Sequence, residues 1–346
     1  MFWKSKQFWG TIVAVALLGY CVKDITLDEL RILSQRVDYW YLLPALFCTF
    51  LFVVLRAMRW QLMVSQHKKI KAPRAIALYS AGQVLNIVMP MLTGQVGRLF
   101  LFARKEGLRK TFVFSTIILE VLFDATSLVI FLAFSSLAFG VKAEYRAAGV
   151  VIAVITVSLL ILLYTVLHFQ TKLEDIGRLR LRHRWPSMYV GLKKFMRSFT
   201  KGIRTLRSSQ HFFGTVAYSL ASWTAHTAVI YFLFLSFGLH LPFAAAAVVM
   251  IVNTLALLIP ITPGNAGTFE VAVSTSLTAF AVGRSDAVLF AVALHIIDLL
   301  PVFVLGMSFL HMERVSIREI KSEHRDRDIL DQVSENGTLI EAEERP

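Results

Sequence analysis

The chain has 346 residues, of which 56% are hydrophobic and only 17% charged, and its mean hydropathy is +0.62. A soluble domain of this length does not need so much apolar sequence, so the composition predicts an all-α, polytopic membrane protein with no room for a separate soluble catalytic domain. The formal net charge of +13 is concentrated in short segments between apolar runs. This distribution is typical of cytoplasmic loops and argues against nucleic acid as a partner.

The apolar runs, taken in chain order, predict about six full transmembrane helices. They cover residues 8–22, 39–58, 111–139, 147–168, 212–237 and 287–310. Lys4 and Lys6 precede the first run and no A-x-A cleavage site follows it, so we expect a retained helix that starts in the cytoplasm. Basic residues from Arg56 to Arg74 place the chain back in the cytoplasm after the second run.

Two stretches share the pattern P-x-x-x-G-[QN]-x-G. The first runs from Pro90 to Gly97 and the second from Pro260 to Gly267, so the second copy begins 170 positions after the first. This matched spacing indicates an internal repeat. Paired Gly/Pro interruptions in the two halves of a membrane protein point to a transporter's binding site, whereas the alternative is two ordinary helix kinks.

Each copy lies in an apolar stretch that fits a re-entrant helical hairpin. Residues 75–103 are flanked by cytoplasmic basic residues on both sides and are too short for two spans of about 20 residues each. If the C-terminal tail is cytoplasmic, residues 241–282 begin and end outside, so the second hairpin opens the opposite way. Span and hairpin therefore occur twice with opposite orientation, which predicts an inverted-topology repeat.

The predicted domain, residues 1–312, divides into two halves joined by a basic linker. Half one covers 39–169, the linker 170–210 and half two 211–312, and residues 313–346 form a charged tail that we expect to be disordered and cytoplasmic. The linker holds 11 Lys and Arg residues. It predicts either a basic amphipathic helix on the anionic inner leaflet or a plain positive-inside loop. Both termini are expected in the cytoplasm.

A few ionisable residues interrupt the apolar segments. Arg98 directly follows the first Pro/Gly copy, and Glu270 follows the second. Glu120 and Asp124 share a helix face at i, i+4, and so do His295 and Asp298 at i, i+3. Charges inside a membrane are costly, so these residues predict either an interior transport path or structural salt bridges such as Arg98–Glu120. His226 is expected to be a packing histidine.

Several of these motifs together resemble one known family. They are Arg56-Ala-Met-Arg-Trp60, the segment from Pro90 to Arg98, Glu120 with Asp124, and Pro263-Gly-Asn-Ala-Gly-Thr-Phe-Glu270. The chain resembles, over roughly residues 8–312, the flippase-like transmembrane family, which includes the N-terminal region of lysylphosphatidylglycerol synthase/flippase. The resemblance implies translocation of a polar membrane lipid, either a phospholipid or a polyprenyl-phosphate-linked lipid, across the cell's inner membrane. This chain lacks the soluble aminoacyl-transferase domain of the fused members, so synthase activity is not expected.

The resulting hypothesis is a lipid flippase without cofactor or metal. Glycine amides and Arg98 would bind a head-group phosphate, polar side chains would hydrogen-bond it, and the acidic and histidine pairs would carry a proton or bind a cationic group. The predicted substrate-binding residues are Gly94, Gln95, Gly97, Arg98, Glu120, Asp124, Asn253, Gly264, Asn265, Gly267, Glu270, His295 and Asp298. The alternatives are a membrane-embedded lipid transferase and a non-transporting partner of a separate lipid-synthesising enzyme.

Overall fold

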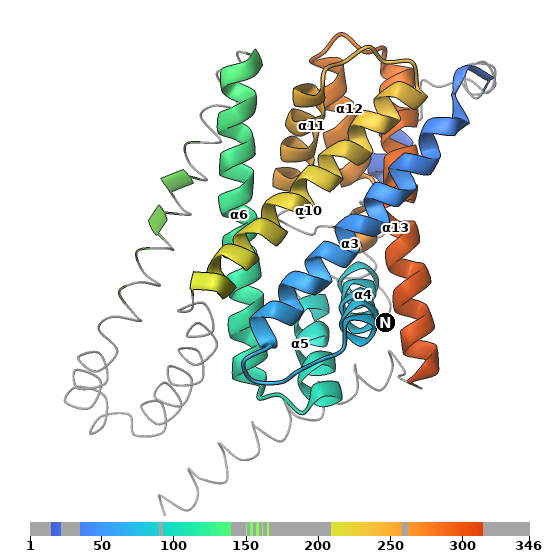
Figure 1. The fold of residues 1–346 in the computed structure, drawn as a ribbon. Coiled ribbons are helices and arrows are strands. Elements are labelled where there is room, and N and C mark those ends of the chain that lie inside the picture. The colour runs from blue at the N-terminus through green and yellow to red at the C-terminus, as the bar shows by residue number, and fades with distance from the viewer. Residues whose placement is uncertain are drawn as a thin grey trace, which may run out of the picture.

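The fold is given by a computed structural model that describes residues 15–21, 35–89, 93–139, 209–257 and 262–313, with positions 150, 153, 154, 157, 158, 161 and 165. All regular structure in these residues is helical (Figure 1), which confirms the predicted all-α class. The elements are η2 (Tyr39–Tyr41), α3 (Leu42–Val64), α4 (Ala72–Val88), α5 (Thr93–Glu106), α6 (Lys110–Phe139), α10 (Ser209–Ser236), α11 (Phe243–Ala256), η4 (Pro263–Asn265), α12 (Thr268–Thr278) and α13 (Arg284–Met312).

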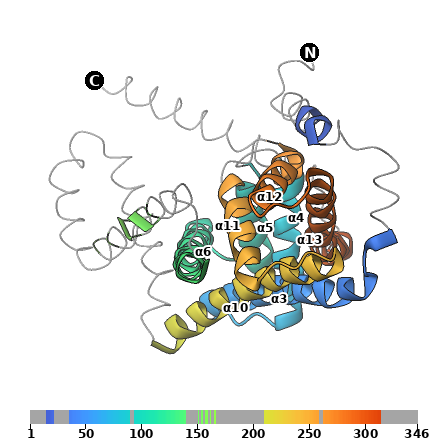
Figure 2. The ribbon, with the colours of Figure 1, turned by 90° about the horizontal axis from the view of Figure 1, so that it is seen from above.

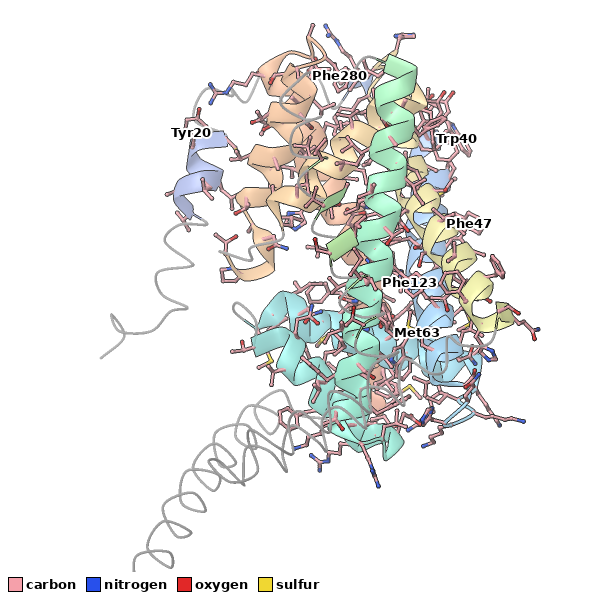
Figure 3. The ribbon with its side chains drawn as sticks, turned by 90° about the vertical axis from the view of Figure 1, so that its left-hand side faces the viewer. Tyr20, Trp40, Phe47, Met63, Phe123 and Phe280 are labelled. Carbon is pink, nitrogen blue, oxygen red and sulfur yellow. The ribbon has the colours of Figure 1, made fainter. Side chains whose placement is uncertain are left out.

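Four helical segments among the described residues are long and apolar enough to cross a membrane. They are Tyr39–Val64, Lys110–Ser135, Ser209–Ser236 and Arg284–Met312, and they correspond to four of the six predicted spans. Of the other two predicted spans, the structure describes only residues 15–21 of 8–22 and seven separate positions of 147–168, so neither can be compared along its length. Trp40 and Phe47 project outward from the α3 side of the bundle (Figure 3) and are 79% and 65% exposed, as expected for a surface that faces lipid.

One boundary corrects the sequence analysis. The second span was expected to end near residue 58, with Arg56 and Arg59 in a cytoplasmic loop, but α3 continues to Val64. Arg59 is fully buried. The two arginines therefore belong to the interior of the helix bundle, and the next exposed basic residues along the chain, such as Lys68, come after α3.

The first Pro/Gly stretch separates two short helices, α4 and α5, which pack against each other. With a rise of 1.5 Å per residue, their 17 and 14 residues give lengths of about 25 and 21 Å, less than the roughly 30 Å of a bilayer core. Pro73 stands at the start of α4, where the missing N–H costs nothing. Pro90 itself lies outside the described residues.

The second stretch separates α11 from α12 in the same way, with η4 between them. Figure 1 shows α11 and α12 in the upper half of the molecule and α4 and α5 in the lower half. The two short-helix pairs meet where η4 contacts α4. This arrangement is the one expected of two hairpins entering from opposite sides, and the re-entrant insertion and inverted repeat stay predictions. Pro260 also lies outside the described residues.

Three helices join the two halves of the bundle. The helices α3 and α10 pack along each other, as Figures 1 and 2 show, and α13 passes beside α3, α4, α10 and α12. The C-terminal half of α13 contributes Val302 and Phe309 to a hydrophobic cluster around α3 to α5. Its N-terminal half contributes Phe290 and Leu294 to a second cluster around α10 to α12. Continuous helices thus hold α4 and η4 at a fixed point of contact.

Small residues allow the helices of the first cluster to approach closely. A methyl group on Gly306 of α13 would lie 2.6 Å from the carbonyl oxygen of Ser80 on α4. A methyl group on Gly94 of α5 would lie 2.6 Å from the Cα atom of Asn86 on α4. Such small-residue contacts are the usual way in which helices associate in lipid.

An ion-pair cluster joins the ends of α4, α5 and α13. The buried Glu106 carboxylate contacts Lys68 at 2.9 Å and Arg74 at 2.6 Å. The Glu313 carboxylate, at the C-terminal end of α13, contacts Arg74 at 3.0 Å and Lys105 at 2.8 Å. The hydrogen bond from Lys105 holds the pKa of Glu313 below its ordinary value of 4.5. This cluster fixes α13 to the first hairpin at that end of the molecule.

The basic linker and the charged tail cannot be compared with the structure. Residues 170–208 and 314–346 lie outside the described residues, and α10 begins at Ser209.

Candidate functional site

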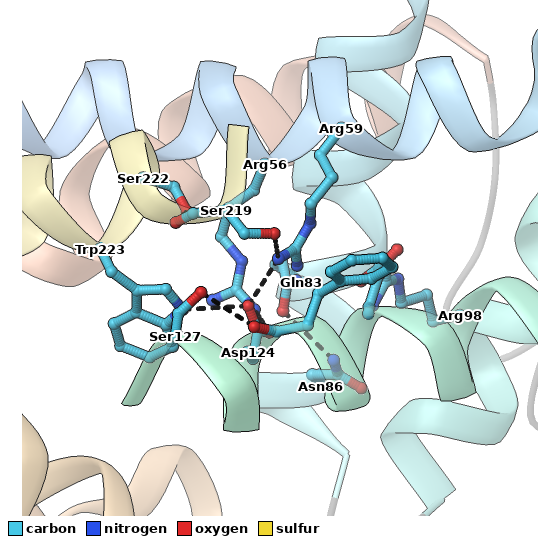
Figure 4. Close-up of polar contacts among 12 residues, drawn as sticks. Arg56, Arg59, Gln83, Asn86, Arg98, Asp124, Ser127, Ser219, Ser222 and Trp223 are labelled. Atoms are coloured by element: carbon cyan, nitrogen blue, oxygen red, sulfur yellow. Dashed lines mark hydrogen bonds and ion pairs between the residues drawn. The ribbon is translucent and has the colours of Figure 1, made fainter. Parts of the chain in front are cut away.

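One carboxylate on α6 lies at the centre of the polar interior (Figure 4). Asp124 accepts hydrogen bonds from Arg56 and Arg59 of α3, and the bond from Arg59 Nη1 is 2.7 Å long. The indole Nε1 of Trp223 on α10 donates to the same carboxylate at 3.1 Å. Arg59 Nη1 also donates to Ser219 Oγ at 2.8 Å. A single aspartate therefore ties α3, α6 and α10 together.

A second ion pair lies one helical turn earlier on α6. Arg98 Nη2 of α5 donates to both carboxylate oxygens of Glu120, at 2.7 and 2.8 Å. The two side chains are only 3% and 4% exposed. The Arg98 guanidinium lies 4.7 Å from the ring centroid of Tyr79 and 4.9 Å from that of Phe102, so two aromatic faces add cation–π attraction. The predicted Arg98–Glu120 salt bridge is present.

The ion pairs of Asp124 and Glu120 with their three arginines together form what we call the arginine-rich site. This site has a surplus of positive charge. Three guanidinium groups face two carboxylates. Within the part of the chain that the structure describes, four of their N–H positions have no hydrogen-bond partner: Nε of Arg56, Arg59 and Arg98, and Nη2 of Arg59. Unpaired donors on buried cations are costly, and they favour an anion with several acceptor oxygens, such as a phosphate group.

Two amides of α4 lie beside this charge. Figure 4 shows Gln83 and Asn86 between Asp124 and Arg98. The Asn86 Nδ2 donates to Gln83 Oε1 at 3.2 Å, and the buried Asn86 Oδ1 has no partner among the described residues. The amides provide neutral hydrogen-bonding groups next to the guanidinium groups, as a polar head group needs.

The second hairpin carries a separate polar site. His295 on α13 contacts Glu270 of α12 through Nδ1 at 2.7 Å and the carbonyl oxygen of Gly264 through Nε2 at 3.1 Å. The other Glu270 oxygen accepts the Gly267 N–H at 2.6 Å. The ring of Phe269 stacks on the imidazole with centroids 4.3 Å apart. Gly264 and Gly267 have φ values of +61° and +84°, a backbone conformation that glycine adopts readily.

A third pair lies between the two sites. His226 on α10 contacts Asp298 of α13 through Nε2 at 3.1 Å. The ring of Phe52 stacks on His226 with centroids 4.8 Å apart, and the Arg56 guanidinium lies 5.2 Å from the same Phe52 ring. The stacked rings of Phe52 and His226 therefore lie between Arg56 of the first half and Asp298 of the second. His226, expected to be a packing residue, is a hydrogen-bond partner of Asp298 as well.

The sequence profile of the family described as "Lysylphosphatidylglycerol synthase TM region" matches residues 7–306. The chain belongs to this family. The match covers every described helix of the bundle except the end of α13. Together with the four helices that are long and apolar enough to cross a membrane, it indicates a multi-pass membrane protein. No curated protein and no solved structure matches the chain.

Most of the predicted site residues of this family member fall into the three groups above. Arg98, Glu120 and Asp124 lie in the arginine-rich site, and Gly264, Gly267, Glu270 and His295 lie together in the second hairpin. His295 and Asp298 share a face of α13 as expected, but their partners lie on different helices.

The remaining predicted residues lie apart from these contacts. Gly94 and Gly97 are inside α5 and pack against α4: a methyl group on Gly97 would lie 3.0 Å from Met89 Sδ, at the end of that helix. Gln95 is exposed. Asn253 is buried on α11 with its Oδ1 unpartnered among the described residues. Asn265 follows Gly264 with a φ of +58°.

Sequence reasoning missed Arg56, Arg59, Trp223 and Ser219 as site residues. The two arginines stand at i, i+3 and therefore share a helix face within an apolar run, and this spacing was the available signal. Among the described residues, no group of three or more His, Cys, Asp or Glu side chains is arranged to hold a metal ion.

Proposed function

We propose that the protein is a translocator that moves a phosphate-bearing polar lipid between the leaflets of the cell's inner membrane, with both termini in the cytoplasm. The observation that carries this proposal is the surplus guanidinium charge around Asp124, with four unpaired N–H positions in a membrane interior. An isolated charge at the bilayer centre costs about 2.5–3.5 kcal/mol even on insertion scales. A lipid phosphate would neutralise that charge and accept these N–H groups.

The geometry also supports transport rather than chemistry. The arginine-rich site lies beside α4 of the first hairpin, and the second hairpin reaches the same helix through η4. Irregular backbone at membrane depth is tolerated where it is buried in protein or lines a cavity. A head group held between the two hairpins would leave its acyl chains in the apolar surroundings. The protein is proposed to act without a cofactor.

The test compares two substitutions with different effects on the surplus charge. Arg56→Gln removes the surplus and leaves Asp124 with Arg59 and Trp223, so the fold is expected to survive. Replacing both partners, Arg98→Gln with Glu120→Gln, removes one ion pair and keeps the surplus. Arg104→Gln, at an exposed position of α5, changes the total charge by the same amount as Arg56→Gln and serves as the control.

In proteoliposomes, Arg56→Gln should slow the movement of a fluorescent anionic phospholipid at least about tenfold, which corresponds to 1.4 kcal/mol. The Arg104→Gln control should keep most of the wild-type rate. The double variant keeps the surplus charge but loses the unpaired Nε of Arg98, so its rate should lie between those of the control and Arg56→Gln. Native mass spectrometry should show less co-purified anionic lipid for Arg56→Gln alone. Wild-type rates in the folded Arg56→Gln variant would contradict the proposal, and formation of a modified lipid by the purified protein would favour a transferase. Movement only with an added lipid-synthesising enzyme would indicate a partner subunit.

A further inference from the structure

The imidazole of His295 lies between two oxygen acceptors. Its Nε2 is 3.1 Å from the carbonyl oxygen of Gly264, and its Nδ1 is 2.7 Å from Glu270 Oε1. A peptide carbonyl oxygen carries no hydrogen and only accepts, so Nε2 has to donate. Hydrogen positions at a histidine follow from its partners, and here one partner fixes the proton on Nε2.

The contact with Glu270 then requires one more proton. If the carboxylate is ionised, it only accepts, so Nδ1 also carries a hydrogen and the ring is an imidazolium. If the ring is neutral, the hydrogen lies on Glu270 Oε1 and is donated to Nδ1. Glu270 Oε2 already accepts the Gly267 N–H at 2.6 Å and does not hold the proton. In both cases the pair has a net charge of zero.

We propose that the Glu270–His295 pair is a proton-binding site that holds η4, in the second Pro/Gly stretch, in place. Release of the proton to water leaves a neutral imidazole and an ionised carboxylate, so the pair changes from zero charge to −1. The ring then has one hydrogen for two acceptors. A nitrogen lone pair faces either the Gly264 carbonyl or the Glu270 carboxylate, and one of the two contacts is lost.

Loss of this contact also affects the first hairpin, through α4. Gly264 belongs to η4, which contacts α4, and a Cβ atom at Gly264 would lie 3.5 Å from Ile87 Cγ2. The η4 segment is thus held by His295 on one side and lies against α4 on the other. Proton release therefore loosens the point where the two hairpins meet.

Several charged groups on α13 and on the helices packed against it have partners of their own. Asp298, one turn from His295, is bound to His226 of α10, and Arg56 of α3 is bound to Asp124. Arg74 of α4 contacts Glu106 and Glu313, the latter at the far end of α13. Glu270 is the one ionisable residue of α12. The thiol of Cys21 lies within electrostatic range of Glu270, and Arg284 lies within range of that thiol.

His226 provides an internal comparison. Its Nε2 contacts Asp298, and its buried Nδ1 has no partner among the described residues. A neutral imidazole that donates from Nε2 satisfies this geometry. The two histidine–carboxylate pairs are therefore predicted to differ in the number of protons they hold. The His295–Glu270 pair shares one additional proton, whereas the contacts of His226 are satisfied without it.

Glu270→Gln removes the releasable proton but preserves the hydrogen bonds. The glutamine amide N–H donates to Nδ1 of a neutral His295, its oxygen accepts the Gly267 N–H, and Nε2–H still donates to Gly264. The variant keeps every contact and has no proton to release. His226→Gln is the matched control, because it removes a histidine bound to a carboxylate in the other pair.

The first measurement uses the full chain in nanodiscs with ¹⁵N-labelled histidine, together with the infrared carbonyl band of protonated carboxyl groups. At neutral pH, the wild type should show either two protonated nitrogens at His295 or a carboxyl band that disappears in Glu270→Gln. As the pH is raised and the pair loses its proton, thermal stability should fall. Glu270→Gln should lose this step and His226→Gln should keep it. A neutral imidazole beside an ionised Glu270, or the same stability step in Glu270→Gln, would overturn the proton site.

The second measurement concerns lipid movement, and this part rests on the proposed function. In proteoliposomes with anionic phospholipid, the wild-type rate should change with pH and with an imposed proton gradient. In Glu270→Gln, the rate of lipid movement should respond to neither, whatever its absolute value. A full gradient response in Glu270→Gln would overturn the coupling. If the wild type moves no lipid at all, the proposed function and the coupling fail together, whereas the spectroscopic result decides the proton site by itself.

Discussion

Arg59 and Asp124 lie 65 positions apart in the chain, and Arg59 Nη1 donates to Asp124 Oδ1 at 2.7 Å with the arginine side chain fully buried. This bond joins α3 to α6, and Trp223 extends it to α10. The α6 helix carries both carboxylates of the arginine-rich site, so its position relative to α3 and α5 depends on ion pairs. The predictions below separate the structural role of these and other contacts from their role in lipid binding.

Arg98 and Glu120 should behave as a coupled pair. Arg98→Gln leaves a buried carboxylate without its partner and should lower the free energy of unfolding by about 3–5 kcal/mol. The double variant with Glu120→Gln removes both charges, so it should be more stable than the single variant by at least ~1 kcal/mol. Unfolding in mixed detergent measures both values. Additive losses would show that the two side chains do not interact energetically.

Replacing the glycines at the close helix contacts with alanine should lower stability, because there is no room for the added methyl group. Gly94→Ala and Gly306→Ala each place a methyl group 2.6 Å from backbone atoms of α4, so each should cost about 1–3 kcal/mol in stability. Gly283→Ala is the control, because the nearest atom to its added methyl, Asp286 Oδ2, lies 3.9 Å away. Thermal unfolding of the three purified variants measures the difference. Equal midpoints in all three would contradict the tight packing.

Glu313 should give the structure a measurable acid sensitivity. Its pKa in the folded protein is lowered by Lys105, so its ion pairs stabilise the fold fully above the ordinary value of 4.5. This stability is lost as pH falls through the lowered folded pKa. For a partly exposed pair the effect is small, about 0.2–1 kcal/mol, and salt should reduce it. The difference in stability between wild type and Glu313→Gln, measured against pH, should shrink toward zero in acid.

The predicted topology places the two ends of α3 on opposite sides of the membrane. In a background with Cys21 and Cys48 replaced by serine, a cysteine at Trp40 should react with an impermeant maleimide from outside intact cells. A cysteine at Lys69 should react only after permeabilisation. Both positions are exposed. The reverse labelling pattern would invert the orientation and with it the assignment of both termini to the cytoplasm.

The helical class and four of the spans were predictable because apolar runs of about 20 residues have few alternatives. The failure at Arg56 and Arg59 has a physical cause. The positive-inside rule treats arginines near the end of an apolar run as loop residues, but α3 continues for six residues beyond the expected end at Met58. Carboxylates on a neighbouring helix made these arginines compatible with the interior, and helical spacing within one segment cannot reveal such partners.

The same limit applies to the pairs on α13. The spacing of His295 and Asp298 correctly placed them on one face, yet the facing elements decide that one binds Glu270 and the other His226. Glycine is ambiguous in a different way. Gly94 and Gly264 occupy equivalent positions of the repeated pattern, but the first permits close helix packing and the second adopts a positive φ. Both requirements select glycine, so the sequence alone does not distinguish them.

The distance along the chain between Arg56 and its carboxylate affects how the protein is made. Asp124 follows Arg56 by 68 residues and the Ser219 hydroxyl follows Arg59 by 160. During synthesis, α3 therefore emerges from the ribosome with two guanidinium groups long before either partner exists. Each arginine opposes insertion of the nascent helix by up to about 2.5–3.5 kcal/mol, depending on its depth. We expect α3 to be retained at the insertion machinery, or to lie shallow in the bilayer, until α6 has been synthesised.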